Sequence, residues 1–266
     1  METIRATLTL YARVLTQTFQ SLGRAWVLIV AVVAFAILMM LATMIAAPLG
    51  LVGGFILGAV NALLIGATLS LMADAILTVR PIRLPDIGES FGRHFWDVIG
   101  VGFMLWIPLM VMDRAAAASP QGSFVSAALF LLLFFLLNPA PEVIYQVRHG
   151  SPLDVFRESY EFILENWIEW FLPLAIVIAP LGLSFFFAVS GRLGRGAGLD
   201  FFQILVLPVT LVTGWLGYLG VPQGAASFIV LMVTPPVAVA MMLFRGHLFA
   251  ALHGTSRRQR RFAMVQ

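Results

Sequence analysis

Three ionisable residues lie within long apolar stretches of the sequence, where a charge is costly unless it has a partner. They are Asp74, Glu142 and Arg245. Inside a bilayer such a group costs about 2.5–3.5 kcal/mol on insertion scales and usually faces a partner. We therefore expect an intramembrane polar cluster in which Arg245 pairs with one or both acids. The alternative is that all three side chains reach the headgroup layer and are ordinary charges at helix ends.

A proline-rich motif, Asn-Pro-Ala-Pro-Glu, occupies residues 138–142. Proline lacks an N–H donor and clashes with the preceding helical turn, so Pro139 and Pro141 must disrupt any helix that contains them. The carbonyl groups freed by this disruption lie beside Glu142 and could form a cation or proton site. The other interpretation, which we favour, is a kink that lets neighbouring helices pack.

A stripe of small residues, Gly50, Gly54 and Gly58, repeats at every fourth position and leads to Asn61. This spacing lets a second helix approach closely, with Asn61 hydrogen-bonded across the contact. The alternative role for Asn61 is to line a substrate path.

The sequence shows no arrangement of nucleophile, acid–base pair or metal ligands. It has no Cys, which excludes disulfides and thiolate chemistry, and its four His residues lack the spacing of metal ligands. We predict no catalytic residue, no cofactor and no metal site, and expect that the protein is not an enzyme.

The elements that must position these residues are membrane helices. Hydrophobic residues make up 61% of the chain and charged residues 11%, against about 45–50% and roughly 25% in a soluble domain. Several apolar runs approach or exceed the roughly 20 residues that a helix needs to cross a bilayer. The predicted fold is an all-α polytopic membrane protein with one membrane domain over residues 1–250. We expect six spans, at about 25–46, 49–78, 98–113, 123–147, 167–189 and 224–250.

Amphipathic stretches precede the first, third and fifth of these spans, at 1–24, 82–97 and 152–166. Their apolar residues recur at helical spacing, which favours helices lying in the headgroup region. In the first stretch these residues are Ile4, Leu8, Tyr11, Leu15 and Phe19. Thr18, Ser90 and Ser159 stand at matching positions, so we predict three repeats of an interfacial helix followed by a helical pair.

A seventh apolar run, 200–219, contains Pro208, Gly214 and Gly217, which weaken a continuous helix. If it crossed the membrane, the basic tail 251–266 would lie outside the cell, against the rule that Arg-rich segments stay in the cytoplasm. We therefore expect residues 190–223 to form an external insertion that is re-entrant or interfacial.

The basic residues, all of them Arg, define the predicted orientation. With six spans, all except Arg114, Arg192 and Arg195 lie on one side. The sequence thus predicts a multi-pass membrane protein with both termini in the cytoplasm. Tail residues attract anionic lipid by about 1 kcal/mol each, and no compact basic patch indicates a nucleic-acid partner. The tail residues concerned are Arg257, Arg258, Arg260 and Arg261.

The segment from Pro141 to Trp167, PEVIYQVRHGSPLDVFRESYEFILENW, joins a Pro-Glu helix end to a polar turn and an amphipathic helix. It resembles the bacterial membrane-domain superfamily that includes the membrane part of glycerophosphodiester phosphodiesterases and many six-helix inner-membrane proteins. The resemblance implies a six-helix protein of a bacterial inner membrane with cytoplasmic interfacial helices. No phosphodiesterase domain is attached, so that activity is not implied.

Three functions remain open at this point. We expect a subunit or accessory of a transport or envelope-assembly complex, with a protein partner or as a homodimer. The second is a permease subunit of an ABC-type exporter, in which 82–96 contacts an ATPase; this is an analogy of architecture alone. The third is a membrane enzyme acting on lipid.

Overall fold

We describe a computed structural model of the chain over residues 2–118, 120–178 and 215–254. In these residues the backbone forms helices and short turns, without a strand, so the predicted all-α fold is confirmed. The helices are α1 (Glu2–Arg24), α2 (Val27–Ala46), the 3-10 helix η1 (Ala47–Leu49), α3 (Gly50–Leu77), α4 (Leu84–Ser90), α5 (Phe95–Ala118), α6 (Pro120–Leu136), α7 (Ala140–Gln146), α8 (Pro152–Ile178) and α11 (Gln223–Leu252).

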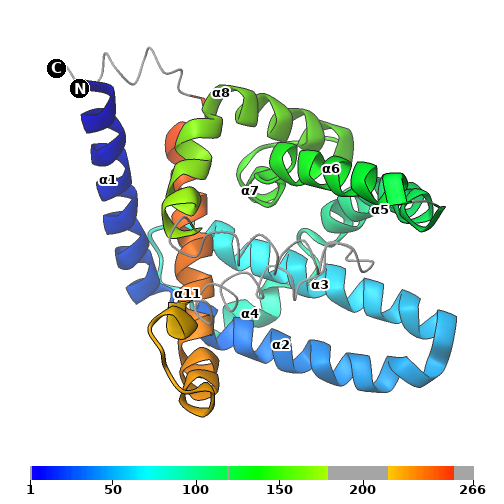
Figure 1. Cartoon of the computed structure of the whole chain (residues 1–266). Helices are drawn as coiled ribbons and strands as arrows, with labels where there is room; N and C mark the ends of the chain where they lie inside the picture. Colours follow the sequence, from blue (N-terminus) through cyan, green and yellow to red (C-terminus); the bar gives the residue numbers. More distant parts are fainter. Residues whose placement is uncertain (1, 119, 179–214, 255–266) are drawn as a thin grey trace.

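Two antiparallel helical hairpins form apolar arms of the molecule (Figure 1). In the first, α2 and α3 pack along each other and reverse direction at η1. The reversal is tight because Gly50 takes a φ of 57°, which is unfavourable for residues with a side chain. A Cβ at Gly53 would also strike the carbonyl of Ala46. The second hairpin consists of α5 and α6.

A second group of helices, α1, α8 and α11, packs at the base of these arms. α1 lies beside α11, and both run at a steep angle to the α2–α3 hairpin (Figure 1). α8 contacts α11 through Phe162 and Trp170, whose rings lie 4.6 and 6.4 Å from that of Phe249. The described helices therefore do not form one parallel bundle.

Four segments of the described chain are long and apolar enough to cross a membrane. They are Val27–Leu77, Phe95–Met112, Ala128–Gln146 and Gly224–Leu252. The first holds both helices of the α2–α3 hairpin. The structure is thus compatible with a membrane protein, while the six spans and their repeat layout stay predictions.

Several element boundaries differ from those that periodicity predicts. The stretch 82–97 is divided, because Gly92 takes a φ of 87° and α5 begins at Phe95. The predicted amphipathic helix 152–166 and the beginning of the predicted span after it form one helix. This helix, α8, continues to Ile178, and no Gly or Pro interrupts it before Pro173. Most of the predicted insertion 190–223 and of the tail 251–266 lies outside the described residues.

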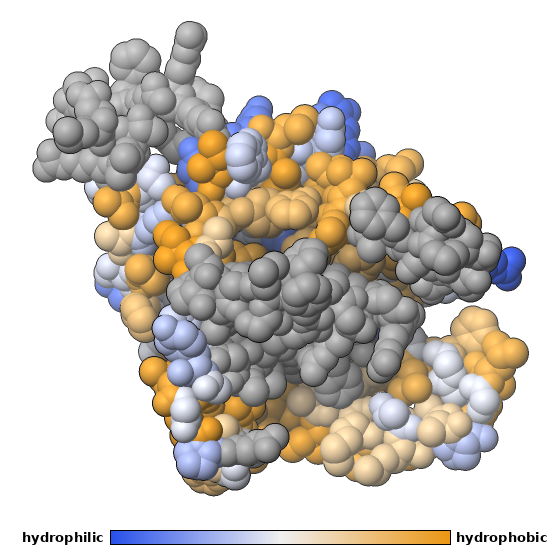
Figure 2. All heavy atoms as spheres, viewed as in Figure 1, coloured by the Kyte–Doolittle hydropathy of each residue, from blue (hydrophilic) through white to orange (hydrophobic). Residues whose placement is uncertain are grey.

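The packed core lies where the arms meet α7 and α11, and the outer face of the arms is apolar. Leu71, Val143 and Leu243 are completely buried there. Near the far end of the first arm, Leu51 and Phe55 are 83% and 76% exposed. Figure 2 shows hydrophobic residues over much of the visible face, including this arm. Such exposure fits a surface that faces lipid.

Candidate functional site at the break between α6 and α7

The chain breaks at the proline-rich motif. α6 ends at Leu136, and α7 begins at Ala140 after a short turn. In a continuous helix the carbonyl of Asn138 would accept a hydrogen bond from the N–H of Glu142. Here it accepts one from Arg245 Nη2 instead, at 2.7 Å. A side chain of the distant helix α11 thus satisfies a backbone carbonyl that lies outside both helices at this break.

Arg245 binds Glu142 at the same point through two parallel hydrogen bonds. Arg245 Nε donates to Glu142 Oε1 at 2.8 Å, and Nη2 donates to Oε2 at 3.0 Å. The Glu142 side chain is only 5% exposed. Two-point binding of a carboxylate by a guanidinium has the most favourable geometry for a charged pair, and the burial of Glu142 makes the loss of its cation costly.

Trp170 of α8 completes the group. Its ring lies under the Arg245 guanidinium, with the ring centroid 5.0 Å from Cζ. Its indole Nε1 donates to Asn138 Oδ1 at 2.8 Å. Because this contact uses the ring face and the N–H together, Trp170 fixes both the cation and the turn that binds it. We call Asn138, Glu142, Trp170 and Arg245 the arginine clamp.

A close approach of α11 to its neighbours makes this geometry possible. Gly246 follows Arg245, and a Cβ there would strike Ile76 of α3 and the Tyr145 hydroxyl of α7. Gln146 Nε2 donates to the Gly246 carbonyl at 3.0 Å. The clamp therefore joins the end of α6, α7, α8 and α11 through satisfied polar contacts.

The chemistry open to the clamp is restricted by its own pairing. The place beside the freed Asn138 carbonyl and the Glu142 carboxylate, where a cation could bind, is filled by the Arg245 guanidinium. Both Glu142 oxygens accept hydrogen bonds from it. This arrangement suits a structural connection between helices better than proton exchange.

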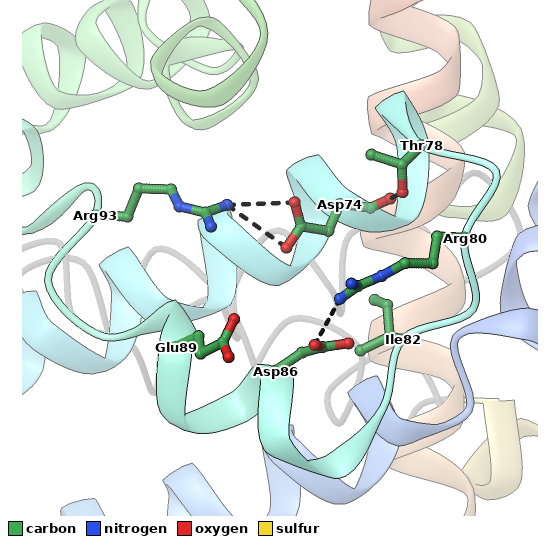
Figure 3. A pocket seen from close by; sticks show the side chains of 7 residues that line it. All are labelled: Asp74, Thr78, Arg80, Ile82, Asp86, Glu89 and Arg93. Atoms are coloured by element: carbon green, nitrogen blue, oxygen red, sulfur yellow. Dashed lines mark hydrogen bonds and ion pairs between the residues drawn. The ribbon is translucent and has the colours of Figure 1, made fainter.

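Asp74, the third predicted member of the cluster, lies elsewhere. It pairs with Arg93 at 3.2 Å, and its side chain is 34% exposed. Both line a polar pocket of about 340 Å³ between the end of α3 and α4 (Figure 3). The remaining lining residues are Thr78, Arg80, Ile82, Asp86 and Glu89. Arg245 thus pairs with one of the two acids.

Asp86 organises one side of this pocket. Its Oδ2 accepts the backbone N–H of Arg83 at 2.7 Å, and its Oδ1 pairs with Arg80 at 2.6 Å (Figure 3). The backbone hydrogen bond, followed by the Arg80 guanidinium, holds the pKa of Asp86 below its ordinary value. A carboxylate in the first turn also complements the positive end of α4.

The small-residue stripe has no helix against it in the described chain. A Cβ at Gly54 or Gly58 would meet nothing within 4 Å, and Asn61 is partly buried on α3. The close contacts are at Gly53 and at Gly66, which the start of α5 approaches. The packing role predicted for Gly50, Gly54 and Gly58 is therefore not filled by the described residues.

Sequence reasoning identified Glu142 and Arg245 but missed Trp170, Gly246 and Arg93. The position of an indole under a guanidinium depends on how α8 meets α11, and no local pattern encodes that meeting. Arg93 is one of the many arginines that predict the orientation of the chain, and nothing in its spacing from Asp74 indicates that the two pair.

Among the described residues, no three His, Asp or Glu side chains lie together as a metal site. Comparisons with protein-family models, curated proteins and solved structures give no match to this chain. The functional evidence therefore comes from the geometry of the chain itself.

Proposed function

We propose that the protein is a multi-pass inner-membrane subunit or accessory of a transport or envelope-assembly complex. The observation that carries this proposal is the contrast between its closed interior and its open apolar arms. The buried Glu142 carboxylate is paired within the arginine clamp, whereas the α2–α3 arm exposes apolar side chains over much of its length. A rigid base with an uncovered apolar arm suits association within a membrane.

The small-residue stripe is the part of the arm best suited to a protein partner. Gly54 and Gly58 are exposed on α3 and a Cβ at either would meet open space. In a bilayer, helices associate through close backbone contact at small residues, because lipid supplies no hydrophobic driving force between them. A helix of another subunit or of a second copy would fit against this stripe.

Co-purification of the full chain in mild detergent tests the proposal. We expect a stable partner or a dimer that is lost when Gly54 and Gly58 are both replaced by Leu. Replacing Val33 by Leu, at an exposed position of α2, is the matched control and should retain the partner. If the unchanged protein emerges alone and monomeric, the proposal is wrong.

The three-repeat layout belongs to the same proposal, and the matching hydroxyls support it. Thr18, Ser90 and Ser159 are all at least 98% buried. Each donates a hydrogen bond to a carbonyl three or four residues earlier in its own helix, at 2.7 or 2.8 Å. Equivalent environments at positions predicted to be equivalent favour a repeated unit.

An ABC-type permease is the second candidate, and the arrangement of α1 and α4 favours it. α1 passes into α2 through only Ala25 and Trp26, as an elbow helix would, and the short α4 joins α3 to α5. In this alternative, α4 contacts a cytoplasmic ATPase. An ATPase that co-purifies with the full chain, and is lost when Leu84 of α4 is replaced by Asp, would select it. A partner without nucleotide-hydrolysing activity would reject it.

A further inference from the structure

α1 exposes an apolar stripe that the packing of the chain leaves uncovered. Leu8, Leu15 and Phe19 are 62%, 45% and 66% exposed, and Ala12 lies between them on the same face of the helix. Tyr11, predicted to belong to this face, turns toward the protein. Its hydroxyl donates to the carbonyl of Glu169 at 2.8 Å.

A different face of α1 is held by the rest of the chain. Val14, Thr18 and Ser21 are buried, and the Ser21 hydroxyl is hydrogen-bonded to His247 of α11 at 2.9 Å. Burial raises the pKa of Tyr11 to about 12, so the hydroxyl that contacts α8 stays protonated. These contacts fix the rotation of α1, and therefore fix which residues face outward.

The third face of α1 is polar along most of the helix. Thr9, Arg13, Gln20 and Arg24 are exposed on it. A helix that crosses a bilayer upright cannot keep a water-facing side along its length, because lipid satisfies neither charges nor amides. A helix lying in the interface meets protein, lipid and water on three sides at once.

The junction with α2 also places the end of α1 in the membrane interface. Only Ala25 and Trp26 separate the two helices, and Trp26 is 55% exposed. An exposed Trp beside Arg24 is typical of the headgroup layer. α1 also runs at a steep angle to α2 (Figure 1), as expected where an interfacial helix turns into a span.

We infer that α1 is an in-plane membrane anchor whose stripe of Leu8, Ala12, Leu15 and Phe19 inserts into the boundary between headgroups and acyl chains. The occupant of the stripe is lipid, and anionic headgroups fit best because α1 carries three Arg and one acid. This inference rests on the proposed membrane function and adds the residues that contact lipid and the direction that each face takes.

The absence of Cys from the chain permits a direct test with single spin-labelled cysteines. Labels at Leu15 and Phe19 test the stripe, and labels at Arg13 and Gln20 test the polar face. Ile37 of α2 and Glu161 of α8, both exposed, serve as lipid and water references. The full chain is placed in bilayers of equal parts phosphatidylcholine and phosphatidylglycerol. Collision of each label with oxygen, which favours lipid, is compared with collision with a water-soluble nickel chelate.

Labels at 15 and 19 should share the several-fold higher oxygen-to-nickel ratio of the label at 37. Labels at 13 and 20 should match the label at 161. A stripe open to nickel would show that α1 lies outside the membrane. A stripe shielded from both reagents would show that protein covers it. Either result overturns the inference about α1 and leaves the proposed membrane function standing. If the label at 37 is also open to nickel, the membrane function fails together with it.

Discussion

At the scale of single residues, the stability of the arginine clamp depends on one buried charge, the Glu142 carboxylate. Arg245 satisfies a carboxylate and a freed carbonyl together and covers an indole ring. Removing it would leave the Glu142 carboxylate buried without its cation. Removing both charges would leave no orphaned ion, although the Asn138 carbonyl would still lose its donor. The pair is therefore expected to behave non-additively.

We predict that Arg245→Met lowers the free energy of unfolding by about 3–5 kcal/mol, the usual cost of breaking a buried pair. The double variant Arg245→Met, Glu142→Leu should recover a substantial part of that loss. Thermal unfolding in mild detergent measures both. Arg157→Met is the control, because its pair with Glu161 is exposed and should contribute at most about 1 kcal/mol. Equal losses at residues 245 and 157 would contradict a clamp.

Gly246 tests the close approach that lets the clamp form. Gly246→Ala places a Cβ against Ile76 and the Tyr145 hydroxyl, so we expect a loss of about 1–3 kcal/mol from overpacking. The double variant Gly246→Ala, Ile76→Val has a shorter neighbouring side chain and should recover part of the lost stability. Gly224→Ala on the same helix meets nothing within 4 Å and should not lower the melting temperature. A neutral Gly246→Ala would show that the ends of the Ile76 and Tyr145 side chains move aside, so that the close approach does not limit this position.

At the scale of elements, the first turn of α4 depends on the ionised form of Asp86. Its folded pKa is lowered, so its contribution to the turn is complete above the ordinary aspartate pKa of about 3.9. That contribution is lost as the pH falls through the lower folded value. A spin label at Gly88, which is exposed with open space around it, should keep its mobility from pH 7 to about pH 4 and become more mobile as the pH is lowered further.

Two variants separate this effect from general acid unfolding. Asp86→Asn should make the label mobile already at neutral pH, because a neutral amide cannot form the ion pair with Arg80 and accepts the Arg83 backbone N–H less strongly than a carboxylate. Glu89→Gln should behave like the unchanged chain, since Glu89 has no polar partner among the described residues. An identical pH response in Asp86→Asn and the unchanged chain would rule out Asp86 as the cause.

Elements were predictable from sequence where the pattern is local. Long apolar runs located α2 and α3, and two prolines located the break after α6. Glu142 and Arg245 were expected to pair because burying either alone is costly. The partner of Asp74 was not predictable in this way, because a carboxylate at a partly exposed helix end can choose among several arginines. The continuity of α8 was not predictable either, because an amphipathic first half and an apolar second half have the patterns of two separate elements.

At the scale of the whole molecule, the steep crossing of α11 and the α2–α3 hairpin limits how the chain can lie in a membrane (Figure 1). Helices at a steep angle cannot all stand upright, although each is long enough to span. α3 has 28 residues, or roughly 42 Å at 1.5 Å per residue, which exceeds the roughly 30 Å hydrocarbon layer. The two ends of α3 should therefore reach opposite faces of the membrane.

The topology of the chain follows from labelling these ends. In right-side-out and inverted vesicles, a membrane-impermeant maleimide should reach Ala47→Cys and Val79→Cys from opposite sides, because η1 and the α3–α4 loop are both exposed. The Arg-rich surroundings of Val79 predict that its side is the cytoplasm. With six spans, a reporter fused after Gln266 must share that side. Reaction of both cysteines from one side would mean that α3 does not cross. A reporter on the side opposite Val79 would make the number of crossings odd, which requires either that the apolar run 200–219 crosses as well or that α11, which is steeply inclined to α3 (Figure 1), does not cross.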